Sequence, residues 1–171
     1  MLREFEFFHG IVFARLLHAT SERISIKPFP TSDNASYVIN ETVGVYIKYS
    51  SKRLTPWGFS FQKRHQDEIL RMKNELGEVF VLLVCNDDGI VGLNFDEVRN
   101  LLDEAHQDAE WIRVARSRGQ MYAVSGSDGA LGYKASKDDF GQRIITASKS
   151  QIVKVPILSW FKSDRAETVR K

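Results

Sequence analysis

The chain has few of the residues on which thiol chemistry depends, and it has no long apolar run. Cys85 is the only cysteine among 171 residues, which excludes an intrachain disulfide. It closes the apolar run Val79–Cys85, where a cysteine is typical of a small core residue and not of a nucleophile. No apolar run approaches the roughly 20 residues of a membrane-spanning helix, and the first residues lack the pattern of a secretory signal. We therefore expect a cytoplasmic protein with no membrane partner.

Sequence patterns of metal sites and common enzymes are also missing. The four histidines lie at positions 9, 18, 65 and 106, and none has metal-ligand spacing to another or to Cys85. The chain has no phosphate-binding glycine loop that opens a helix and no G-x-S-x-G nucleophile elbow, which argues against the dinucleotide-binding and hydrolase classes. Asp87 and Asp88 offer adjacent oxygens of the kind that Mg²⁺ prefers. The turn formed by Asp88 and Gly89 accounts for them without a metal, and we favour that interpretation.

Acidic residues are absent from the 25 positions between Thr42 and Gln66, and this gap is the most informative feature of the sequence. The stretch holds five cations and five aromatic residues, which is typical of a surface that binds phosphates and stacks on bases. An aromatic core with solvated lysine tips is the alternative. Strand alternation places Val43, Val45, Ile47 and Tyr49 on one face, which we expect to be the core face. It places Tyr46, Lys48 and Lys52 on the more polar face. The predicted nucleic-acid contacts are Tyr46, Lys48, Lys52, Arg53, Trp57, Lys63 and Arg64.

Charge is unevenly distributed although the net charge is only +2. Residues 1–66 hold nine cations and five anions, residues 67–110 hold three and twelve, and residues 111–171 hold twelve and five. If the two basic thirds share a face, the molecule can steer a polyanion. The alternative is that opposite thirds pair with each other.

The hydrophobic pattern predicts a single α/β (or α+β) domain over residues 1–146, with a mixed sheet centred on Val79–Cys85 and helices packed against it. Residues 147–171 are expected to form a C-terminal extension that is partly disordered. Helices are expected over residues 3–19, from His65 to Leu76 with Gly77 as the stop, and from Phe95 to about Glu104 with Asn94 as the cap. A hairpin is expected from Ser36 to Ser51, with Trp57 in the loop that follows it.

This element order, with a lysine at position 48, resembles the restriction-endonuclease-like nucleases that carry a PD-(D/E)xK motif. The resemblance covers roughly residues 3–93 and implies a nuclease-like core in which two carboxylates hold Mg²⁺ and the lysine activates water. Asp33 is then the first acid and Lys48 the lysine, both catalytic if the chain is a nuclease. Tyr46 stands where the second acid belongs, so the motif is degenerate. The acids that this implies as candidate substitutes or helical partners are Glu6, Asp67 and Glu68.

The run Ile47–Phe61 also resembles a family of small, uncharacterised prokaryotic proteins, which implies no function. Three hypotheses follow. The leading one is a nucleic-acid-interacting protein on a degenerate nuclease-like core, without a cofactor. The second is a protein-interaction module or homodimer that uses the acidic middle third and the apolar cluster near Trp160. The third is a Mg²⁺-dependent nuclease.

Overall fold

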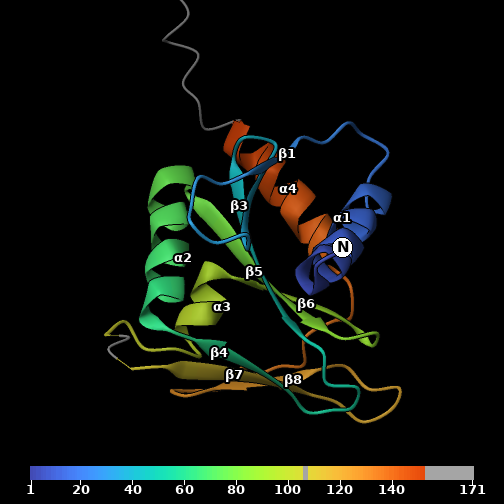
Figure 1. The fold of residues 1–171 in the computed structure, drawn as a ribbon, viewed down its shortest axis with the longest axis vertical. Coiled ribbons are helices and arrows are strands. Elements are labelled where there is room, and N and C mark those ends of the chain that lie inside the picture. Colours follow the sequence, from blue (N-terminus) through green and yellow to red (C-terminus); the bar gives the residue numbers. More distant parts are fainter. Residues whose placement is uncertain (106–107, 153–171) are drawn as a thin grey trace, which may run out of the picture.

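The chain begins with helix α1 (Glu4–His18) and then builds a five-stranded mixed sheet, sheet A. The computed structural model describes residues 1–105 and 108–152 (Figure 1). The strands of sheet A are β1 (Ile26–Pro28), β2 (Ser36–Ile39), β3 (Val43–Ser50), β5 (Glu78–Cys85) and β6 (Gly89–Asn94). Their order is β1-β2-β3-β5-β6, and only β3 and β5 run parallel. Helix α2 (Lys63–Leu76) makes the crossover between these two strands and ends at Gly77, whose φ of 82° suits glycine.

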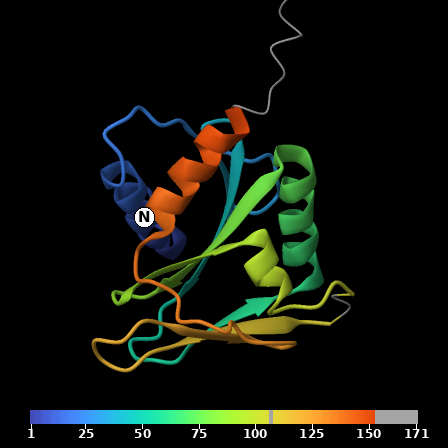
Figure 2. The same ribbon diagram turned by 180° about the vertical axis from the view of Figure 1, so that it is seen from behind.

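A second, antiparallel sheet, sheet B, contains β4 (Trp57–Phe61), β7 (Glu110–Ala115) and β8 (Ala123–Gly126) in the order β4-β7-β8. Sheet B lies crosswise below one end of sheet A, as the view from behind also shows (Figure 2). The two remaining helices are α3 (Phe95–Arg99), which follows β6, and α4 (Phe140–Ile152), which packs beside α1. The predicted α/β fold is confirmed. None of the described helices combines the length and the apolar character that crossing a membrane requires.

Two apolar clusters cover the two faces of sheet A. On one face, α1 and α4 pack on Phe80, Leu82 and Val84 of β5. On the other face, α2, α3 and the inner side of sheet B pack on the alternate residues of β5, which include Val81 and Leu83. Every residue of the apolar run is therefore buried, as expected for a strand covered on both faces.

This double covering corrects the expectation for the polar face of β3. Tyr46 points toward α2 and sheet B and is 2% exposed. Sheet B covers the face of β3 that we expected to be exposed to solvent. Trp57 begins β4 instead of lying in a loop, and it is 3% exposed. The prediction that these two rings lie on an open surface is wrong.

Helices α3 and α4 differ from what the sequence predicted. Helix α3 starts at Phe95, directly after the expected cap Asn94. The Asn94 side chain accepts a hydrogen bond from the Glu97 N–H, and the Glu97 carboxylate accepts one from the Asn94 N–H. It ends at Arg99, earlier than expected. Helix α4 was not predicted, and it crosses the expected domain boundary at residue 146, so that boundary falls inside a helix. Residues 153–171 of the expected extension lie outside the described part of the chain.

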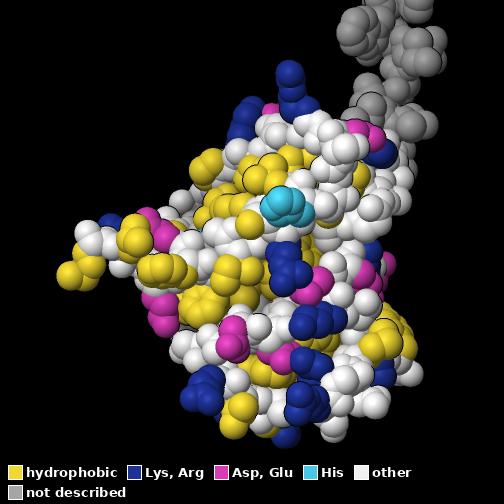
Figure 3. All heavy atoms as spheres, turned by 90° about the vertical axis from the view of Figure 1, so that its right-hand side faces the viewer, with side chains coloured by type: hydrophobic (Ala, Val, Ile, Leu, Met, Phe, Trp, Pro, Cys, Tyr) yellow, Lys and Arg dark blue, Asp and Glu magenta, His cyan; other side chains and the backbone are white. Residues whose placement is uncertain are grey.

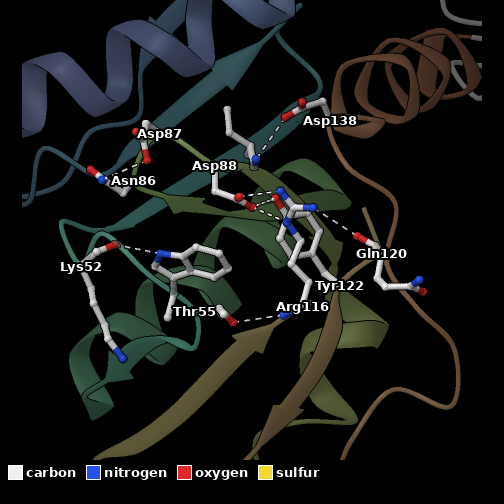
Figure 4. A network of polar contacts seen from close by, with 11 residues as sticks. Lys52, Thr55, Asn86, Asp87, Asp88, Arg116, Gln120, Tyr122 and Asp138 are labelled. Carbon is white, nitrogen blue, oxygen red and sulfur yellow. Dashed lines mark hydrogen bonds and ion pairs between the residues drawn. The ribbon is translucent and has the colours of Figure 1, made fainter. Parts of the chain in front are cut away.

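A polar network around Asp88 joins the two sheets (Figure 4). Asp88, in the turn between β5 and β6, pairs with Arg116 at the end of β7 through contacts of 2.5 and 2.6 Å. The Tyr122 hydroxyl donates to the same carboxylate at 2.5 Å. Arg116 holds the pKa of Asp88 below its usual range. Asp88 thus serves the turn and the junction between the sheets.

Candidate nucleic-acid interface

A pocket of about 540 Å³ opens where the two sheets and two helices meet. It lies between α1, the loop after β1, the second half of β3, strand β4 and the first turn of α2. Parallel pairing of β3 with β5 fixes the position of β3, and the short link from β4 to α2 places the helix start beside it. The lining residues with polar or aromatic side chains are Phe5, His9, Asp33, Asn34, Tyr46, Lys48, Tyr49, Phe59, Ser60, Arg64 and His65.

Lys48 is the half-buried cation of this pocket. Its Nζ lies 5.0 Å from the centre of the Phe61 ring, and among the described residues it forms no ion pair. Burial and the nearby Arg64 guanidinium lower the pKa of Lys48 to about 8, while Asp33 opposes the shift. The positive charge at this position is therefore only partly compensated by the protein.

Arg64 and Asp33 lie at the rim. Arg64 Nη1 is 3.4 Å from Asp33 Oδ1, and its Nε donates to Gln62 Oε1 at 2.9 Å. The guanidinium side chain remains 64% exposed, so this ion pair is a weak, solvated one. Arg64 can exchange its contact with Asp33 for a contact with an incoming anion.

His65 is a neutral structural residue. Its Nδ1 accepts the Gln62 backbone N–H at 3.1 Å, which closes the start of α2. Burial, Lys48 and Arg64 lower the pKa of His65 to about 4. The first turn of α2 holds no acid, although acids are the residues that a helix N-terminus favours. Both the helix end and the side chains here favour a negative ligand.

The structure brings together four of the predicted site residues and separates the others. Asp33, Tyr46, Lys48 and Arg64 all line the pocket. The other four lie outside its lining: Lys52, Arg53, Trp57 and Lys63. The Lys52 ammonium donates to the Pro56 carbonyl at 2.8 Å, and Lys63 pairs with Asp67 at 2.9 Å.

Neither predicted stacking ring is available, because Trp57 and Tyr46 belong to the core. The Trp57 indole N–H donates to the Lys52 carbonyl at 2.8 Å. Two partly exposed rings that were not predicted for the site, Phe5 and Tyr49, line the pocket in their place. Tyr49 belongs to the same aromatic stretch of sequence, whereas Phe5 comes from α1 and only the fold could identify it.

The acids proposed as substitutes have separate roles. Glu6 accepts the Arg3 N–H at the start of α1. Glu68 accepts a hydrogen bond from the Ser36 hydroxyl. The pKa of Tyr46 is raised mainly by burial, and the Glu68 carboxylate raises it further. A carboxylate from α2 therefore acts on the tyrosine that stands at the missing acid's position.

Opposite charges lie close together over much of the surface. On the face that Figure 3 shows, Lys and Arg side chains lie beside Asp and Glu side chains. Arg15 with Asp138 at 3.1 Å is an example of pairing between distant parts of the chain. Trp160, assigned to the alternative protein-interaction surface, lies outside the described residues.

The chain matches no protein-family model, no curated protein and no solved structure among those compared. Its function is therefore inferred from the chemistry of the pocket.

Proposed function

We propose that this pocket binds the sugar-phosphate backbone of a nucleic acid, with Lys48 and Arg64 as the phosphate contacts. The observation that supports this most is the half-buried Lys48 ammonium. It lies in an open pocket, and no described carboxylate forms an ion pair with it. A buried charge without a partner is unfavourable, so its retention is explained by an anionic ligand. A phosphate at this point also meets the N-terminal end of α2.

The surroundings of the pocket favour a polymer over a single small anion. Its volume of about 540 Å³ accommodates a nucleotide. The partly exposed rings of Phe5 and of Tyr49, one face of which is stacked on Phe8, offer aromatic contacts that tolerate any base. Lys52 and Arg53, exposed cations that follow β3 in the chain, lie outside the pocket lining and are not needed for this contact.

Equilibrium binding of labelled single-stranded and duplex oligonucleotides at low salt tests the proposal. We expect Lys48→Gln and Arg64→Gln each to weaken binding about tenfold, because each removes a charged contact to phosphate. Arg113→Gln, on an exposed side chain of β7 that does not line the pocket, is the matched control and should bind as the wild type does. Failure of the wild-type protein to bind either oligonucleotide would reject the proposal.

A Mg²⁺-dependent nuclease is the second candidate, because Asp33 and Lys48 line the same pocket. They are the pair that the PD-(D/E)xK resemblance implies, with Glu68 beside Tyr46 as the shifted acid. Incubation of supercoiled plasmid with Mg²⁺ or Mn²⁺ separates this candidate from simple binding. Cleavage that Lys48→Ala and Asp33→Asn both abolish would support it, and binding without cleavage would reject it.

A further inference from the structure

The amine of Lys48 has no polar partner in the part of the chain that the structure describes. No hydrogen bond and no ion pair reaches its Nζ there, and the nearest ring, that of Phe61, has its centre 5.0 Å away. By contrast, the ammonium of Lys52, two turns of strand further along, donates to the Pro56 carbonyl. A half-buried amine that faces an open pocket and an aromatic ring has the surroundings of a lysine that attacks carbonyl groups.

The charges around this amine favour its neutral, nucleophilic form. Burial and the Arg64 guanidinium lower the pKa of Lys48 to about 8, and Asp33 opposes the shift. His65 adds no positive charge, because its own pKa is lowered to about 4. At pH 7 about a tenth of the Lys48 amines are therefore neutral, whereas the figure for an ordinary lysine is about one in 2,500.

The other polar side chains of the pocket suit a sugar phosphate. Arg64 lies at the rim with its guanidinium 64% exposed, where it can hold a phosphate next to the amine. Asp33 is the only acid among the described residues that line the pocket, and it can accept a proton from a bound sugar. One cavity thus combines a nucleophile, an anion contact and a base.

We propose that Lys48 forms a Schiff base with the ring-opened aldehyde of an abasic site in DNA, and that the pocket then breaks the strand at that sugar. This inference rests on the nucleic-acid binding proposed above and names the substrate within it. An abasic nucleotide has lost its base, so turning it out of the duplex into a pocket costs less than for an intact nucleotide. Its C1′ aldehyde is a carbonyl that a lysine amine can attack.

The reaction needs no metal and no cofactor. The Lys48 nitrogen bonds to C1′, and the aldehyde oxygen leaves as water, which gives an iminium ion. The iminium draws electrons from the C2′–H bond, and the proton passes to the Asp33 carboxylate. The resulting enamine expels the 3′-phosphate with the electron pair of the C3′–O bond. Water then hydrolyses the iminium, which frees the unsaturated aldehyde and restores the amine.

Reductive trapping in the presence of EDTA tests the proposal. Wild-type protein, a duplex with one abasic site and sodium cyanoborohydride should give a covalent protein–DNA adduct, which peptide mass spectrometry should locate on Lys48. Without the reductant, the strand should be cut at the abasic site. Lys48→Arg should lower both yields about tenfold or more while it keeps its affinity for intact DNA, because arginine retains the charge but is not a nucleophile.

Two further variants separate the steps. Asp33→Asn should still be trapped, but its rate of strand cutting should fall about tenfold or more, because the proton acceptor is lost. Lys63→Arg is the matched control, since Lys63 lies outside the pocket lining and pairs with Asp67. It should keep the trapping and the cutting of the wild type.

The absence of an adduct from protein that binds intact DNA would overturn this proposal and leave phosphate binding standing. Equal trapping of wild type and Lys48→Arg would also overturn it, since the reaction would then occur at other amines. An adduct formed as readily with ribose 5-phosphate would overturn the assignment to DNA. Failure to bind any oligonucleotide, with or without an abasic site, is the different result that rejects the proposed function itself.

Discussion

Lys48 shows how one residue acquires a functional environment from the fold. Its position in an acid-free stretch of sequence predicts a charged tip in solvent, but β4 and α2 close around it and leave it half-buried. Burial by this closure, together with the nearby Arg64 guanidinium, lowers the pKa of Lys48 to about 8. The residue is therefore cationic at neutral pH and loses its charge in mildly alkaline solution.

Nucleic-acid binding should consequently weaken as the pH rises from 7 to 9.5. The ammonium form binds phosphate and the neutral amine does not, so affinity should fall once the pH exceeds about 8, and somewhat later if the bound anion raises the pKa of Lys48. Lys48→Arg keeps its charge across this range and should show a flat profile. Fluorescence anisotropy at fixed ionic strength measures both. Identical pH profiles for the two proteins would remove Lys48 from the binding site.

His9 predicts the response of stability to acid. The residue is 4% exposed, its Nδ1 lies 2.8 Å from the Tyr37 hydroxyl oxygen, and burial lowers its pKa from 6.5 to about 4. Between these values the unfolded chain binds more protons than the folded one, so stability falls as the pH falls. At pH 5 the loss from His9 should be about 2 kcal/mol.

Urea unfolding at pH 7 and pH 5 measures this loss against His9→Gln, which cannot titrate. The variant should lose about 2 kcal/mol less than the wild type over the same interval. Equal losses in the two proteins would show that His9 is not the residue responsible.

At the scale of the element, strand β3 shows what could be predicted from the sequence and what could not. Alternation correctly assigned Val43, Val45 and Ile47 to a core face, whereas Tyr49, assigned to the same face, is only partly buried and lines the pocket. It did not predict a second core on the other face, because the cover comes from strands β4, β7 and β8, which are distant in the chain. Tyr46 was assigned to solvent for this reason. Of the predicted site, only the residues near Lys48 in space survive in the pocket.

Helix α4 was missed because its apolar face is short and its position depends on contacts with other elements. Phe140, Ile144 and Ile145 form that face, and no capping sequence was recognised before them. Its start lies so close to β6 that a Cβ atom built at Gly92 would be 2.5 Å from the Cβ of Phe140. The Gly92 carbonyl also accepts a hydrogen bond from Arg143 at 2.7 Å.

Gly92→Ala should therefore destabilise the fold by about 1–3 kcal/mol, as overpacking does when backbone must move. Gly132→Ala is the matched control, because nothing lies within 4 Å of its Cβ position, and its effect should be within about 0.5 kcal/mol. Chemical denaturation gives both values. Equal stabilities of the two variants would contradict the close contact between β6 and α4.

At the scale of the whole molecule, the junction between the two sheets determines whether the pocket exists. Residues from sheet A and sheet B line it together, so a relative shift of the sheets would open it. The network of Asp88, Arg116 and Tyr122 is a polar connection across this junction. From the local sequence only the turn at Asp88 could be predicted, because its partners Arg116 and Tyr122 lie 28 and 34 residues away in the chain.

Arg116→Met should lower the free energy of unfolding by about 3 kcal/mol, because it leaves the Asp88 carboxylate, whose side chain is 21% exposed, without its cation. Lys27→Met breaks the solvent-exposed pair with Glu41 and should lower the free energy of unfolding far less than Arg116→Met does. Urea denaturation compares them. A loss for Arg116→Met no greater than that for Lys27→Met would show that the network does not stabilise the junction.

The most direct measurement of the central claim is the salt dependence of oligonucleotide affinity. For the wild type the logarithm of the binding constant should fall linearly with the logarithm of salt concentration, and Lys48→Gln and Arg64→Gln should each reduce the slope by about 1. Arg113→Gln should leave the slope unchanged. Slopes that are the same in all four proteins, or no binding even at low salt, would contradict a phosphate-binding role for the pocket.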